Sequence, residues 1–94
     1  MEIIWRRAAL NDLESVREFI AWDNPRAAAR VHDAVRAAVD PLADLPHVGR
    51  AGRVDGTREL VVGGLPYIVV YRVAETQIRI LAVIHTSRQW PKRF

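Results

Sequence analysis

Apolar residues in the first half of the chain recur at helical spacing. Between residues 7 and 22 they predict an amphipathic helix with the stripe Leu10, Leu13, Val16 or Arg17, and Ile20. A second helix is predicted from Pro25 to about Asp40, with the stripe Ala27, Ala28, Val31, Val35 and Ala38. Between the helices, Asn24 can accept a hydrogen bond from a free amide, and Pro25 suits the first helical position. Pro41 removes a backbone donor and should end or kink the second helix.

The second half of the chain has the pattern of strands and turns. The segment Leu45–Thr57 is predicted to be a loop, because proline and glycine recur along it. A run of β-branched and aromatic residues predicts a central strand at Tyr67–Val73. Further strands are predicted at Met1–Trp5, Arg58–Val62 and Ile78–His85.

The order of these elements predicts the fold class. The apolar stripes of the helical hairpin need a partner surface, and the sheet is the only candidate. We therefore predict an α+β fold in which an N-terminal strand and a helical hairpin pack on a mainly antiparallel sheet of three to four strands. The length predicts one domain, residues 1–94.

Composition narrows the classes of site that the chain can carry. It has no cysteine, which excludes disulfides, thiolate metal sites and cysteine nucleophiles and fits a reducing cytoplasm. The histidines lack metal-ligand spacing, so we predict no metal site and no cofactor. No apolar run is long enough to span a membrane, and the N-terminus does not have the form of a signal peptide. A cytoplasmic location without membrane contact is expected.

Charge is distributed unevenly along the chain. Residues 1–44 carry six basic and eight acidic side chains, a net charge of −2, whereas residues 45–94 carry eight basic and three acidic ones, a net charge of +5. Thirteen of the fourteen basic residues are arginine, whose planar donor fork suits phosphates and carboxylates. The predicted sheet therefore carries a positive charge that favours an acidic partner, whether protein or nucleic acid.

Candidate binding residues lie on this basic half. Arg72 and Arg79 are on neighbouring predicted strands and are expected to oppose each other, where adjacent like charges cost stability unless something acidic compensates. Three side chains suited to recognition lie at the end of the last predicted strand, namely His85, Arg88 and Trp90. Two further candidates are Arg53, in the predicted loop, and Arg58, at the start of the strand that follows it.

Each of these side chains also has a structural interpretation. His85 can be a proton carrier, a contact with the target, or a histidine hydrogen-bonded at a strand end. Trp90 can contact a partner or anchor the tail on the domain. Trp5 and Trp22 are expected to pack in the core or at helix ends. Ser87 lies near no predicted triad, so hydrolase chemistry has little support.

The chain resembles the RelE/ParE superfamily of toxins of type II toxin–antitoxin systems over nearly its whole length. The segments that carry the resemblance are Asp12-Leu13, Asp23-Asn24-Pro25, Leu45–Arg50, Arg58–Val62, Tyr67–Val73 and Ile84–Trp90. The resemblance implies a small cytoplasmic toxin that forms a hetero-oligomer with a ParD-like or RelB-like antitoxin. We expect the antitoxin to cover the helical hairpin and a sheet edge, through a helix in a groove or an added strand.

The resemblance leaves two activities open. RelE-like members cleave messenger RNA in the ribosome, whereas ParE-like members poison DNA gyrase. RelE-like nucleases have an arginine where this chain has Ile68, another near the place of Thr86, lysines near Glu59 and Val61, and a late C-terminal tyrosine that this chain lacks.

Loss of these residues favours gyrase inhibition without catalysis. Two alternatives remain. The first is an endoribonuclease that uses Arg58, His85 and Arg88 in altered roles, and the second is an inactive toxin that only serves in the antitoxin complex. The predicted binding set for antitoxin or target is Arg53, Arg58, Arg72, Arg79, His85, Arg88 and Trp90.

Overall fold

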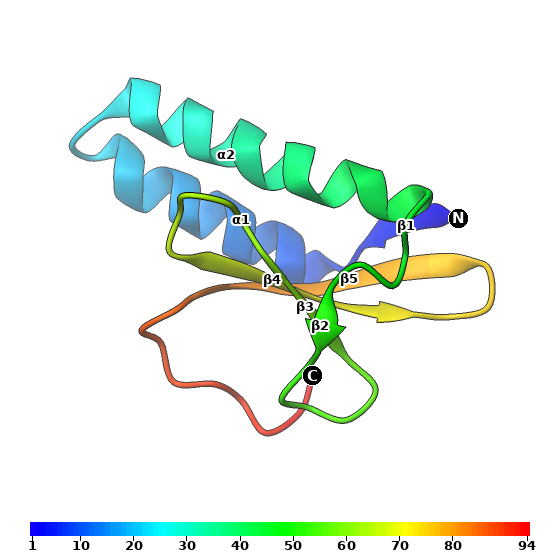
Figure 1. The fold of residues 1–94 in the computed structure, drawn as a ribbon. Helices are drawn as coiled ribbons and strands as arrows, with labels where there is room; N and C mark the ends of the chain where they lie inside the picture. The colour runs from blue at the N-terminus through cyan, green and yellow to red at the C-terminus, as the bar shows by residue number, and fades with distance from the viewer.

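The structure, a computed structural model, describes all residues from 1 to 94. Its elements along the chain are β1 (Glu2–Trp5), α1 (Arg7–Ala21), α2 (Pro25–Val39), the 3-10 helix η1 (Asp40–Ala43), β2 (Arg50–Ala51), β3 (Arg58–Val61), β4 (Tyr67–Val73) and β5 (Gln77–His85). Figure 1 shows the two helices as one layer and the sheet as the other. The predicted α+β class is confirmed. Neither helix is long and apolar enough to cross a membrane.

The sheet has five strands in the order β1-β5-β4-β3-β2, one more than the upper number predicted. The extra strand is β2, a two-residue strand inside the segment predicted as a loop. All neighbours are antiparallel except β1 and β5, which run parallel. Their pairing ends at Trp5↔Ile80. The remainder of β5, Leu81–His85, has no strand on that side, and we call it the free edge of β5.

The helix boundaries follow the signals in the sequence. The side chain of Asn24 accepts a hydrogen bond from the Ala27 amide at 3.1 Å, which caps α2 at its first turn. The helix ends at Val39, just before Pro41, as predicted. The following 3-10 turn then directs Leu42 into the core, where it is fully buried.

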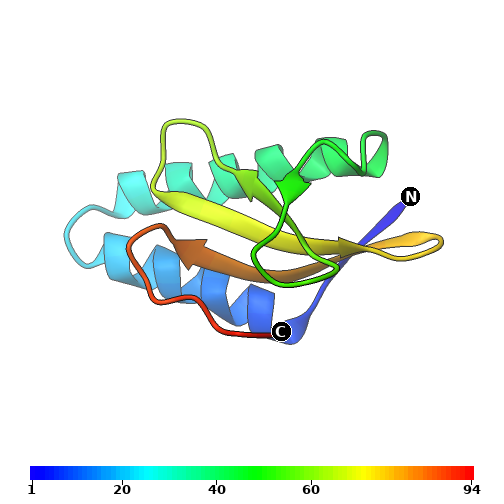
Figure 2. The same ribbon diagram turned by 60° about the horizontal axis from the view of Figure 1, so that its bottom comes forward.

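Side chains are buried on both faces of the sheet. The helices cover one face with a core of twelve buried residues, which includes Leu13, Val35, Val69 and Tyr71. The opposite face, which we call the open face, carries a smaller apolar cluster made by Ile68, Val70, Leu81, Ala82 and Ile84. Two aromatic side chains of the C-terminal tail, Trp90 and Phe94, pack against that cluster. Figure 2 shows this tail, coloured red, leaving the end of β5 and running back along the molecule to the C-terminus.

Two predictions about the helical layer were wrong. The buried face of α1 is centred on Ala9 and Leu13, while Leu10 is exposed. At about 100° per residue, Leu10 lies about 60° from Leu13 around the helix, on the opposite side from Ala9 and Val16, so it falls at the edge of the buried face. Trp22, predicted to pack, has 87% of its surface exposed. It caps the C-terminus of α1 at the turn of the helical hairpin, which projects beyond the sheet in Figure 1.

This exposure gives a test of the arrangement of the hairpin. Trp22→Ser should change the free energy of unfolding by less than about 0.5 kcal/mol, because the side chain has little to lose on folding. Trp5→Ser should cost roughly 1–2 kcal/mol, since Trp5 packs against the core and beneath the Arg36 guanidinium, 5.4 Å from the ring centre. Urea unfolding of both variants measures the two changes in the free energy of unfolding. Equal losses of stability would contradict a hairpin that projects beyond the sheet.

Candidate functional site

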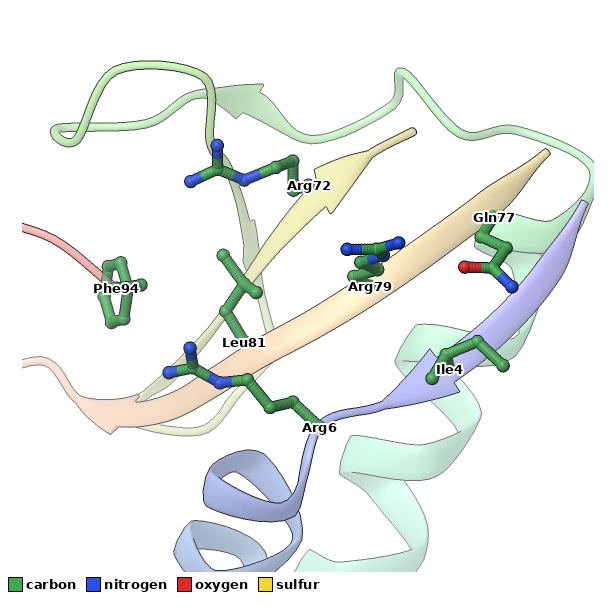
Figure 3. Close-up of a pocket in the computed structure, with 7 residues that line it drawn as sticks. All are labelled: Ile4, Arg6, Arg72, Gln77, Arg79, Leu81 and Phe94. Carbon is green, nitrogen blue, oxygen red and sulfur yellow. The ribbon is translucent and has the colours of Figure 1, made fainter. Parts of the chain in front are cut away.

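A pocket on the open face collects three arginines from neighbouring parts of the sheet. Arg72 lies on β4, Arg79 on β5, and Arg6 directly follows β1. Figure 3 shows their side chains on three sides of Leu81. The pocket has a volume of about 550 Å³, and we call it the basic pocket; its lining is Ile4, Arg6, Arg72, Gln77, Arg79, Leu81 and Phe94.

The predicted opposition of two of these arginines is confirmed, because Arg72 and Arg79 are paired in the register of β4 and β5. No carboxylate lines the pocket. The ion pairs of the chain lie elsewhere and include none of its three guanidinium groups. Like charges at directly opposed positions destabilise a sheet. The pocket is therefore an uncompensated cationic site with an apolar floor, suited to a ligand that carries anionic groups.

Arg53 is half exposed and makes contacts within the chain. The buried carboxylate of Glu59 accepts hydrogen bonds from the Arg53 amide at 2.8 Å and from the Arg50 side chain at 3.0 Å. The Arg53 guanidinium also stacks over Trp90, 4.0 Å from the ring centre. Trp90 in turn packs on the apolar cluster of the open face. The structure thus places Arg53 and Trp90 in one contact that ties the tail to the β2–β3 loop.

Arg58 is also engaged within the chain. Its guanidinium donates to the carbonyl oxygens of Gly49 at 2.8 Å and His47 at 3.2 Å. Tyr71 fixes the same loop, because its hydroxyl donates to the Pro46 carbonyl and accepts from the Gly49 amide, both at 2.9 Å. A Cβ on Gly49 would lie 2.6 Å from that hydroxyl, so the loop needs glycine there.

His85 and Arg88 do come together, in a different place from Arg58. Both line a groove of about 400 Å³ between α1 and the end of β5, which we call the α1–β5 groove. Arg58 pairs with Tyr71 and His85 with Tyr67, four residues away along β4. At the rise of a strand, this separates them by roughly 13 Å before the sideways distance is added. The three candidate catalytic residues are therefore not assembled around one point.

The imidazole ring of His85 is fixed by contacts with neighbouring residues. Its Nδ1 accepts a hydrogen bond from the Ser87 amide at 3.1 Å and lies 2.7 Å from the Ser87 hydroxyl. The ring also makes an edge contact with Tyr67, with 5.3 Å between the ring centres. The neutral imidazole therefore carries its proton on Nε2. No group of three His, Asp or Glu side chains lies close enough to hold a metal ion.

Two residues of these sites were not identified from the sequence. Arg6 joins the basic pocket only because β1 lies beside β5, and nothing in the sequence predicts that parallel pairing. Asp12 lies next to the apolar stripe of α1 and lines the α1–β5 groove. Its carboxylate accepts a hydrogen bond from the Val83 amide at 3.0 Å. The only signal for Asp12 in the sequence was its position as a polar residue beside the buried stripe of α1.

Burial raises the pKa of Asp12, although the Val83 amide and then the charges of Arg88 and Arg6 oppose this shift. Because the folded pKa is the higher one, the folded state holds the proton more tightly than the unfolded chain does. The resulting stability is present below the unfolded pKa of about 3.9 and is lost as the pH rises through the folded pKa.

Asp12→Asn should therefore stabilise the fold at pH 7 and not at pH 3. The amide keeps an acceptor for Val83 and removes the partly buried charge. The gain should stay below about 1 kcal/mol, because the group is only partly buried. Urea unfolding at both pH values measures this, with Asp33→Asn, exposed on α2, as the control. If Asp12→Asn gains more stability over the parent at pH 3 than at pH 7, the raised pKa of Asp12 is contradicted.

Comparison with known proteins places this arrangement in a family. The sequence model described as "ParE toxin of type II toxin-antitoxin system, parDE" matches residues 3–90. The chain is 44% identical over 90 residues to the proposed toxin Y4kP of Sinorhizobium fredii, covering 96% of this chain and 93% of the relative. It is 36% identical over 87 residues to toxin RelE2 of Caulobacter vibrioides, covering 93% and 97%.

Solved structures agree with the sequence comparisons. A chain of the chromosomal ParDE toxin–antitoxin system from P. aeruginosa superimposes with a TM-score of 0.85 at 26% identity, over 93% of this chain and 97% of that one. A chain of the RelBE2 toxin–antitoxin complex from Mycobacterium tuberculosis gives a TM-score of 0.60 at 27% identity, over 89% and 88%. This protein belongs to the family of ParE toxins of type II toxin–antitoxin systems.

Proposed function

We propose that this toxin acts by binding and inhibiting DNA gyrase, without breaking a bond itself, and that a cognate antitoxin neutralises it. The observation that carries the proposal is the separation of Arg58 from His85 and Arg88. Cleavage of RNA through the 2′-hydroxyl needs a base, an acid and cations around one phosphate. The positions at which RelE-like nucleases would carry cations hold instead the buried residues Ile68 and Glu59.

The antitoxin is proposed as the ligand of the basic pocket. The solved structures similar to this chain come from a ParDE system and a RelBE2 complex, which are assemblies of toxin and antitoxin. Arg6, Arg72 and Arg79 form no ion pair within the chain, so carboxylates of a bound protein would relieve their mutual repulsion. The resulting hetero-oligomer would form in the cytoplasm, where gyrase acts.

Supercoiling of relaxed plasmid by purified gyrase tests the proposal. The free toxin should inhibit supercoiling, and the antitoxin encoded in the neighbouring reading frame should restore it when added first. Heat-denatured toxin is the control for non-specific effects of added protein on the assay. Normal supercoiling at a large excess of folded toxin, with ribosome-dependent cleavage of messenger RNA, would reverse the choice of target.

An endoribonuclease of the RelE type is the second candidate, and the identity to toxin RelE2 favours it. It would have to use His85 and Arg88 in the α1–β5 groove. In that case, a folded His85→Ala variant would lose its toxicity and its cleavage of messenger RNA together. Induction of the gene in growing cells separates both activities from the third candidate, because an inactive toxin would leave growth unchanged.

A further inference from the structure

A serine and a histidine are in contact at the turn that follows β5. His85 is the last residue of β5, and Ser87, two residues later, is exposed. The Ser87 hydroxyl oxygen lies 2.7 Å from His85 Nδ1, and the Ser87 amide donates to the same nitrogen at 3.1 Å. The two side chains are therefore within the distance at which a proton passes from a hydroxyl to a base.

The Ser87 amide fixes the direction of the hydroxyl contact. A backbone amide can only donate, so Nδ1 of His85 is the unprotonated nitrogen of the neutral ring. The hydroxyl hydrogen then points at Nδ1, because the contact needs one donor. The edge contact with Tyr67 holds the ring in this orientation. The imidazole is thus already placed to remove the hydroxyl proton, which is how a neighbouring base turns a serine into a nucleophile.

The backbone of this turn offers no donors to a developing oxyanion. The Thr86 amide donates to the Pro66 carbonyl at 2.9 Å. The Arg88 amide donates to the His85 carbonyl at 3.0 Å, and the Ser87 amide is held by Nδ1. Acyl transfer from an ordinary ester or amide depends on free donors of this kind. A group that reaches Ser87 must therefore come from a donor that is already activated and carries a good leaving group.

The α1–β5 groove indicates the chemistry of such a donor. His85 and Arg88 line the groove together with the apolar side chains of Val16 and Phe19. Arg88 forms no ion pair within the chain, although Asp12 lines the same groove. A guanidinium group binds phosphate through paired donors. An acyl phosphate fits these features, because it combines an apolar acyl group and an activated carbonyl with phosphate as the leaving group.

We propose that Ser87 is a modification site that accepts an acyl group from an acyl phosphate, with His85 as the general base. The Ser87 oxygen attacks the carbonyl carbon, and the bond from that carbon to the phosphate oxygen breaks. The hydroxyl proton passes to His85 Nδ1 and then to the departing phosphate. The products are an acyl ester of Ser87 and hydrogen phosphate. The step modifies the toxin itself and does not depend on the target proposed above.

Acetyl phosphate, added to the full chain, is the probe, and mass spectrometry of peptides follows the modification. Ser87 should be acetylated at least about 100-fold faster than Ser15, which is exposed and lines the same groove but has no histidine partner. Hydroxylamine cleaves esters and spares amides, so it distinguishes Ser87 from acetylated Lys92 or an acetylated N-terminus. Equal rates at the two serines would overturn the inference.

The variant His85→Gln separates a base from a hydrogen-bond partner. The glutamine oxygen still accepts a hydrogen bond, but the amide does not take up a proton. Acetylation of Ser87 should therefore slow by about 100-fold or more in the folded variant. His32→Gln, on α2 and outside the groove, should keep the parent rate. An unchanged rate in folded His85→Gln would show that the contact with Ser87 only closes the turn.

The pH dependence of the parent chain tests the same role without a variant. Histidine changes its charge between about pH 5 and pH 8, and a protonated ring cannot accept the hydroxyl proton. Between about pH 8 and pH 5, acetylation of Ser87 should therefore fall far more steeply than that of Ser15. The same decrease at both serines would overturn the role of His85 as the base.

Discussion

Reversing two charges of the basic pocket, in Arg72→Glu/Arg79→Glu, is expected to weaken binding of the antitoxin by about 100-fold or more. Removing one partner of a desolvated ion pair costs about 2–5 kcal/mol, and every 1.4 kcal/mol is tenfold in affinity. Reversal adds repulsion between the new carboxylates and those of the antitoxin. Because the two arginines already oppose each other without a counterion, the fold itself should lose little.

The matched control is Arg26→Glu/Arg30→Glu. It changes the net charge equally, and both arginines are exposed on α2 and do not line the basic pocket. Titration calorimetry with the antitoxin from the neighbouring reading frame compares the two variants. Equal losses in both would show that the antitoxin responds only to net charge. A loss below threefold in the pocket variant would exclude the pocket as an antitoxin site.

Removing the Glu59 carboxylate is expected to give the largest loss of stability at the candidate site. Glu59→Ala should lower the free energy of unfolding by about 2–3 kcal/mol, which for a chain of this size lowers Tm by roughly 10–20 °C. The carboxylate is 2% exposed and accepts hydrogen bonds from the Arg53 amide and the Arg50 side chain. The loss should stay below that of a wholly buried ion pair, because both arginine side chains are about half exposed and remain hydrated.

This substitution should also loosen the tail. Glu59 positions Arg53, and the Arg53 guanidinium stacks over Trp90. Release of the loop should therefore expose Trp90 and shift its fluorescence to longer wavelength. Thermal unfolding followed by circular dichroism gives Tm, with Glu75→Ala in the exposed β4–β5 turn as the control. A Tm within about 3 °C of the parent would show that the buried carboxylate contributes little to the fold.

The central part of the fold could be predicted because local signals there agree with the packing. The β-branched run of Tyr67–Val73 forms β4 with the predicted bounds, and Asn24 and Pro25 begin α2 where the capping pattern indicates. The opposition of Arg72 and Arg79 followed from two adjacent strands joined by a short turn. In each case the residues that set the structure are close together in the sequence.

Features that depend on distant pairing could not be predicted. β1 and β5 are separated by most of the chain, so neither their parallel register nor the arrival of Arg6 in the basic pocket has a local signal. The exposure of Trp22 depends on how far the helical hairpin projects past the sheet. The contacts that Arg53 and Arg58 make within the chain depend on how the β2–β3 segment folds back onto the strands, which no local signal in the sequence indicates.

The most direct test of the account is primer extension on a messenger RNA that is translated in a purified system with the free parent toxin. A toxin that docks without breaking bonds should leave the message intact at concentrations that stop supercoiling by gyrase. Discrete cuts within codons, lost in a folded His85→Ala variant, would contradict that account and make the α1–β5 groove an active site.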